Sequence, residues 1–132
     1  MPFTALTYDI KPGFEAELAE IFGSFRRTAS PDITDESGAV AARILATAVF
    51  FRDPVLIRVI QYEGSLAAIK RHMAVQPGVR EVERRLKPYL AAPRATDTPE
   101  GFARTFDAAT MRCFAQMSVP DTAAVPGDAG AR

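Results

Sequence analysis

The chain has 132 residues, a length that fits a single domain. Its 16 basic and 16 acidic residues give a formal net charge of zero, so no net field attracts a phosphate backbone or an anionic membrane. We therefore expect no nucleic-acid and no membrane partner. The single cysteine, Cys113, lies in an apolar run and has no second cysteine for a disulfide or a metal site, which favours a buried, reduced thiol in the cytoplasm.

The N-terminal region predicts a strand followed by a helix. Residues 3–10 alternate along the strand period, and Lys11-Pro12-Gly13 breaks that pattern as a turn would. From Phe14 the apolar residues recur at helical spacing, and this stripe predicts a helix of about 14–16 residues.

The next region predicts a surface loop and a hairpin. Residues 29–40 mix Ser, Pro, Asp, Thr and Gly without a period, which is typical of a loop. The runs 43–52 and 55–63 are strand-like and flank Asp53-Pro54, a turn signal because proline presets the backbone dihedral. We expect these two strands to pair antiparallel.

Two helical segments follow the hairpin. Ser65 suits the N-cap of the first, which Gln76-Pro77 ends or kinks. The second has a buried apolar stripe and charged residues such as Glu83 and Lys87, whose i,i+4 spacing predicts an outward-facing ion pair.

The C-terminal region predicts a loop, a last strand and a tail. Residues 93–102 resemble a second loop, and residues 104–117 alternate as the last strand would. Residues 119–132 are rich in proline, glycine and alanine, so we expect a disordered tail after a domain spanning residues 1–118.

This order of elements defines the expected fold. Strand, helix, strand, strand, helix, strand is the ferredoxin-like βαββαβ arrangement, an α+β fold with helices on one face of an antiparallel sheet. The other sheet face is too apolar to remain exposed on a soluble monomer. We therefore expect a homodimer, a dimeric α+β barrel, with a cavity between sheet and helices in each subunit.

Several short motifs in the second half of the chain are distinctive. They are Arg71-His72, Gln76-Pro77, Glu83, Pro88-Tyr89-Leu90 and Thr98-Pro99-Glu100-Gly101-Phe102. With these motifs, the chain from Pro2 to about Pro120 resembles the SchA/CurD-like proteins of aromatic polyketide pathways. The order of elements is also similar, more distantly, to tetracenomycin-type polyketide cyclases and to cofactor-free antibiotic biosynthesis monooxygenases, which share the dimeric α+β barrel.

The resemblance implies a function in handling an aromatic polyketide intermediate, either released or presented by an acyl carrier protein. Where the cyclases have a histidine on the third strand this chain has Arg58, and Arg26-Arg27 stand where a second histidine is expected. No zinc spacing, P-loop, GxGxxG turn or Ser/His/Asp arrangement occurs, so we expect no cofactor and no metal.

His72 is the candidate catalytic base for removing a proton between two carbonyls. It is the sole histidine, and an imidazole titrates near neutral pH. Its helical position is the edge of the buried face, so a boundary or capping role is the alternative.

Arg58 and Tyr62 are the other catalytic candidates. They share one face of the third strand because their spacing is even, and Arg43 is expected to join them from the neighbouring strand as a substrate-binding residue. A buried arginine needs a carboxylate, a water or an anionic ligand, whereas an exposed edge position or an ion pair across a dimer would have no such role.

Further aromatic side chains are candidates for substrate binding, since tyrosine can donate to a carbonyl and phenylalanine can stack on a flat ring. These candidates are Tyr8, Phe25, Phe50 and Tyr89.

Three functions remain open from the sequence. The first is a cofactor-free cyclase or aromatase that steers ring closure of a poly-β-ketone, the second an anthrone-type monooxygenase that needs no cofactor. The third is a non-catalytic accessory subunit of the polyketide synthase.

Overall fold

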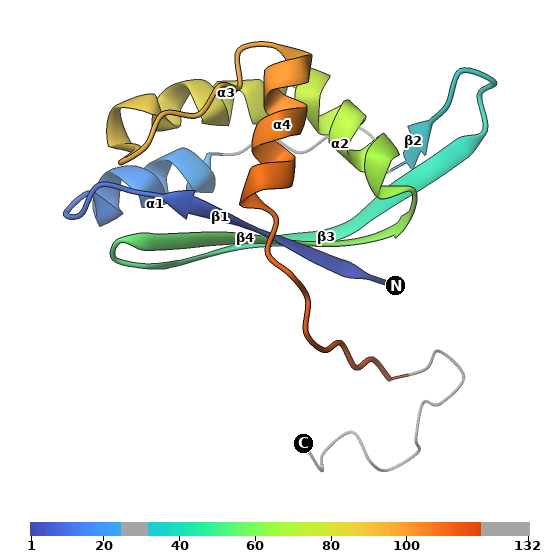
Figure 1. Ribbon diagram of the computed structural model, residues 1–132, viewed down its shortest axis with the longest axis horizontal. Coiled ribbons are helices and arrows are strands. Elements are labelled where there is room, and N and C mark those ends of the chain that lie inside the picture. Colours follow the sequence, from blue (N-terminus) through green and yellow to red (C-terminus); the bar gives the residue numbers. More distant parts are fainter. Residues whose placement is uncertain (25–31, 120–132) are drawn as a thin grey trace.

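A computed structural model describes residues 1–24 and 32–119, and it has two layers (Figure 1). A four-stranded antiparallel sheet in the order β1-β4-β3-β2 carries the helices on one face. This arrangement confirms the α+β, ferredoxin-like class. The strands are β1 (Phe3–Asp9), β2 (Asp32–Thr34), β3 (Val40–Arg52) and β4 (Val55–Gly64). The helices are α1 (Glu15–Gly23), α2 (Leu66–Val75), α3 (Pro77–Leu86), the 3₁₀ turn η1 (Lys87–Tyr89) and α4 (Pro99–Ala109).

The predicted hairpin is confirmed as β3 and β4. A two-residue turn at Asp53-Pro54 fixes the register, so that Arg52 pairs with Val55 and Val49 with Arg58. A register shift between Ile44 and Ala46 interrupts the pairing. β1 lies on the other side of β4 and pairs with it antiparallel over its whole length.

Alternation along the strands separates a covered sheet face from an open one. Leu6 and Tyr8 of β1, with Leu56 and Ile60 of β4, point toward the helices and are buried. Residues between them point to the open face, where side chains such as Phe50 are exposed. The core therefore lies in one layer, between sheet and helices.

The predicted boundary between the two middle helices is also confirmed. Ser65 caps α2, its side chain accepting a hydrogen bond from the backbone N–H of Ala68 at 3.1 Å. Gln76 is extended, and Pro77 begins α3 at a position where the missing N–H costs no helical hydrogen bond.

The expected outward pairing of Glu83 with Lys87 is wrong. Glu83 is buried and pairs with Arg94, whereas Lys87 pairs with Asp97 at 2.6 Å. Pattern alone placed Glu83 on the solvent face because glutamate is almost never buried unless it is paired, and its partner lies in a later loop.

The expected strand over residues 104–117 is wrong as well, because residues 99–109 form α4. Phe102, Phe106 and Ala109 are buried at helical spacing on one face of this helix. The following residues are extended but form only one bridge to β1, between Thr110 and Leu6. Residues 32–34, expected within a loop, form the short edge strand β2.

The segment after α4 leaves the domain on the side away from the helices (Figure 1). Residues 110–119 are exposed throughout, so the expected burial of Cys113 is wrong. Residues 120–132, most of the tail expected to be disordered, lie outside the described residues. Within the described parts of the chain, no helix is long and apolar enough to cross a bilayer.

Candidate functional site

A pocket of about 430 Å³ opens between α1 and the second half of β3. Its volume lies within the range of small-molecule sites. β2 pairs only with residues near the start of β3, so the second half of β3 has no strand partner on this edge within the described chain. The pocket is lined by Glu15, Leu18, Ala19, Phe22, Gly23, Thr47, Ala48, Val49, Phe51 and Arg58.

Arg58 is the cationic group of this mostly apolar pocket. β4 turns its side chain toward the helices, and the residue is only 6% exposed. Its Nε donates to the hydroxyl of Thr47 at 3.3 Å on the neighbouring strand. Because burial strips water from the guanidinium, its positive charge acts strongly on an anionic oxygen that enters the pocket.

Tyr8 lies behind Arg58, in the core. Its phenol is hydrogen-bonded to Arg58, and its ring meets Phe22 edge-on at 6.5 Å between centroids. Burial raises the pKa of Tyr8 above its ordinary value and Glu83 raises it further, while Arg58 and Arg94 act in the opposite direction. Tyr8 is therefore a neutral phenol at physiological pH.

The structure brings together two of the residues expected from sequence, Arg58 and Tyr8, and places others elsewhere. Tyr62 shares the helix-facing side of β4 with Arg58, but it lies opposite Ile44, near the far end of the strand. His72 is half-buried in the last turn of α2 and is not among the described residues that line the pocket.

Arg43 does not join Arg58 and Tyr62. It pairs with Glu63 on the opposite sheet face and makes ion pairs with Asp32 and, at 3.3 Å, with Glu63. The register shift at residues 44–46 reverses the facing of β3, so counting by twos across it fails.

The remaining aromatic candidates are dispersed. Phe50 points to the open sheet face and is 63% exposed. Tyr89 is half-buried in η1 and packs on Phe14 with 5.1 Å between ring centroids. Phe25 lies outside the described residues.

Sequence reasoning missed the pocket residues of β3, although a signal for them exists. The two-residue turn at Asp53-Pro54 places Val49 opposite Arg58, and alternation then adds Thr47 and Phe51 to the same face. It also missed Arg94, because the contact of this residue with Glu83 depends on the fold of a loop, and no periodicity in the sequence predicts that fold.

The chemistry available in the pocket follows from its lining. Phe22 and Phe51 offer aromatic surface to a flat guest, while Arg58 offers N–H donors to a carbonyl, enolate or phenolate oxygen. Within residues 1–24 and 32–119, no three His, Cys, Asp or Glu side chains are grouped so as to hold a metal ion.

Fold and site together define an α+β domain of ferredoxin-like class with a small-molecule pocket under its first helix. The chain belongs to the SchA/CurD-like domain family, whose model matches residues 1–119.

Three relatives from Streptomyces show how this domain occurs in longer proteins. The chain is 35% identical over 89% of its length to the "42.8 kDa protein in whiE locus" of Streptomyces coelicolor, covering 28% of that protein. It is 34% identical over 81% of its length to "Polyketide synthase CurD" of Streptomyces cyaneus, covering 28%, and 32% identical over 77% to "Protein SchA" of Streptomyces halstedii, covering 25%. The chain thus spans about a quarter of the length of these relatives.

Proposed function

We propose that this protein binds an aromatic polyketide intermediate in the pocket beneath α1 and steers its ring closure, as a cofactor-free cyclase or aromatase. The carrying observation is Arg58, a buried cation at the wall of a mostly apolar pocket. The name of one relative, "Polyketide synthase CurD", supports a polyketide as the substrate class.

The proposed reaction needs few protein groups. A proton leaves a methylene between two carbonyls, and the resulting carbanion attacks a ketone carbon, forming a C–C bond. The attacked oxygen takes up a proton to become a hydroxyl, and loss of water then gives the double bond of the new ring. Arg58 stabilises the enolate oxygen formed in the first step, and the apolar walls exclude bulk water from it.

Two residues are candidates for the base that accepts this proton, and mutation distinguishes them. Glu15 is the carboxylate among the described lining residues and lies at the exposed start of α1. His72, the base expected from sequence, lies outside that lining, so its catalytic role stays a prediction. Loss of turnover in His72→Ala with ligand binding retained would assign the proton transfer to His72.

The test adds purified protein to a minimal polyketide synthase that releases a poly-β-ketone, with products followed by mass spectrometry. The cyclase proposal predicts a new product that has lost water, and Arg58→Met lowers its yield at least about tenfold, since a buried charge-assisted hydrogen bond is removed. Arg80→Met, an exposed arginine on α3 outside the pocket, is the matched control.

Other outcomes of the same assay separate the alternatives. A product that has gained oxygen would replace the cyclase by a cofactor-independent monooxygenase. A product spectrum that the protein leaves unchanged would favour the accessory subunit.

We also propose that the protein works as a homodimer. The open sheet face carries exposed apolar side chains such as Phe50 and Val55, and the extended segment beyond α4 adds Phe114 and Met117 on the same side. A chain of zero formal net charge has no net repulsion against its own copy, and an isologous contact buries the same apolar patch on both subunits.

A further inference from the structure

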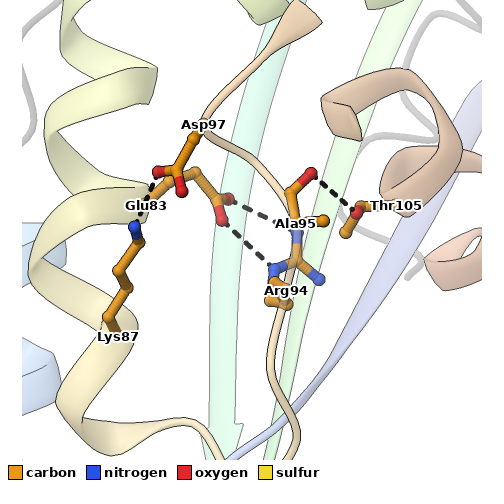
Figure 2. Close-up of polar contacts among 6 residues, drawn as sticks. All are labelled: Glu83, Lys87, Arg94, Ala95, Asp97 and Thr105. Carbon is orange, nitrogen blue, oxygen red and sulfur yellow. Dashed lines mark hydrogen bonds and ion pairs between the residues drawn. The ribbon is translucent and has the colours of Figure 1, made fainter. Parts of the chain in front are cut away.

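A buried ion pair lies in the core, between residues that do not themselves line the pocket. Arg94, in the loop between η1 and α4, directs its guanidinium into the domain toward Glu83 of α3 (Figure 2). The distances are 3.1 Å from Nε to Oε1 and 3.4 Å from Nη2 to Oε2. The two side chains are 11% and 5% exposed. Such a pair is weak evidence for stability, because desolvating both charges offsets most of their attraction.

The same guanidinium touches the residue that supports Arg58. The central carbon of Arg94 lies 4.3 Å from the centroid of the Tyr8 ring, within the distance of a cation–π contact. Tyr8 in turn is hydrogen-bonded to Arg58, which lines the pocket. A continuous row of contacts therefore runs from Glu83 through Arg94 and Tyr8 to Arg58, at the pocket wall.

The loop that carries Arg94 is fastened just after it. Lys87 Nζ binds Asp97 Oδ1 at 2.6 Å, and the Thr105 hydroxyl donates to the carbonyl of Ala95 at 3.5 Å (Figure 2). Gly101 approaches the same Ala95 carbonyl so closely that no side chain fits between them. These contacts fix the backbone from which Arg94 enters the core.

We propose that Glu83 and Arg94 are positioning residues that hold Tyr8, and through it Arg58, in the orientation that binds an anionic oxygen of a flat aromatic ligand. The proposal rests on the proposed pocket function and deepens it. An arginine side chain has many rotamers, so a neighbour that fixes Arg58 before the ligand arrives reduces the entropic cost of binding. Glu83 offsets the charge of Arg94, which keeps the second buried cation from repelling the first.

The test uses alizarin, a flat dihydroxyanthraquinone whose visible spectrum changes when its phenol ionises. The wild-type protein should bind the dye and lower the pH at which the phenolate band appears, because Arg58 favours the anion. Arg58→Met should abolish that shift. Arg94→Met and Glu83→Gln should each retain the folded state but weaken affinity for the anion about tenfold and reduce the shift. Arg94→Lys should restore part of it.

Matched control variants and a double variant separate the positioning role from a general loss of structure. Arg80→Met and Glu36→Gln change exposed residues of the same types and should leave the shift unchanged. Tyr8→Phe keeps the ring that Arg94 covers but removes the hydroxyl bound to Arg58, so it should reduce the shift as well. If the single variants unfold, the double variant Glu83→Leu/Arg94→Met leaves no unpaired buried charge and should show the same reduction.

The outcomes distinguish this proposal from the pocket function. A full shift in Arg94→Met, Glu83→Gln and Tyr8→Phe, with loss in Arg58→Met, would overturn the positioning role and leave the pocket intact. A full shift in Arg58→Met would overturn the pocket itself as the anion site.

Discussion

Arg58 is an arginine in the middle of an apolar strand, and its neighbours show how the fold accommodates it. The guanidinium lies between the Thr47 hydroxyl and the Tyr8 phenol and reaches the pocket from there. Full burial of an unsolvated charge would cost several kcal/mol, and these polar contacts with the open pocket reduce that cost.

The burial of the Tyr8 phenol can be tested by measuring how stability depends on pH. Burial raises its folded-state pKa above the ordinary value of 10.0. The unfolded chain therefore loses this proton first as pH rises, so the contribution of Tyr8 is fully present below pH 10 and is lost above it. We expect the free energy of unfolding to decline above this pH more steeply for wild type than for Tyr8→Phe.

Urea unfolding at several pH values between neutral and strongly alkaline measures this difference. Tyr89→Phe, which changes a half-buried tyrosine in η1, serves as the control and should decline as wild type does. Parallel curves for wild type and Tyr8→Phe would contradict the burial of an un-ionised phenol at this position.

Sequence reasoning at the residue scale succeeded where one element carries the information. Even spacing put Arg58 and Tyr62 on one face of a strand, and the structure confirms that shared face. It failed where the information is tertiary. Nothing local to Glu83 indicates that Arg94, eleven residues later and in a loop, enters the core beside it.

At the scale of elements, the hairpin, the N-cap at Ser65 and the break at Gln76-Pro77 followed from local chemistry and are confirmed. The prediction of a last strand failed because a helical period and a strand period adjoin in this part of the sequence. The alternation from residue 109 to 117 predicts a strand that begins at residue 104 and includes Phe106, whereas the spacing of Phe106 from Phe102 belongs to α4. Thr98 and Pro99, an N-cap and a first-turn proline, were the available signals for that helix.

Gly101 tests how α4 and the Arg94 loop depend on each other. A Cβ at this position would collide with the Ala95 carbonyl, so Gly101→Ala should displace the loop and destabilise the domain by about 1–3 kcal/mol through overpacking. Denaturant titration measures the loss, and alizarin affinity should fall with it because Arg94 shifts.

Gly23→Ala is the matched control for this substitution. Among the described residues, no atom beyond its chain neighbours and its own helix backbone lies within 4 Å of a Cβ built on Gly23. Alanine there should therefore leave the stability equal or raise it by up to about 1 kcal/mol through helix propensity. Equal stability for Gly101→Ala and wild type would show that the loop is not held by this close approach.

At the scale of the whole molecule, the sheet has one covered face and one open face. Helices cover the first. On the second, Phe50 of β3 and Val55 of β4 are exposed, and the segment after α4 leaves the domain on that side (Figure 1). In that segment Phe114 is 88% and Met117 is 95% exposed. The family model extends to residue 119, so this apolar segment belongs to the domain shared by the family.

The exposed face and the segment together predict a homodimer that depends on both. Phe50→Asp places a charge on the open face near the hairpin end of β3, and Phe114→Asp places one on the segment, so each should convert the dimer to a monomer or weaken it at least about tenfold, since an unpaired charge would be buried at the interface. Light scattering after size-exclusion chromatography, over a range of protein concentrations, measures the mass.

Val75→Asp, which charges an exposed apolar position on α2, on the helical side of the domain, is the control and should remain dimeric. A wild-type protein that elutes as a monomer at every concentration would exclude the dimer. Dissociation by Phe50→Asp alone would confine the interface to the sheet and leave the segment outside it.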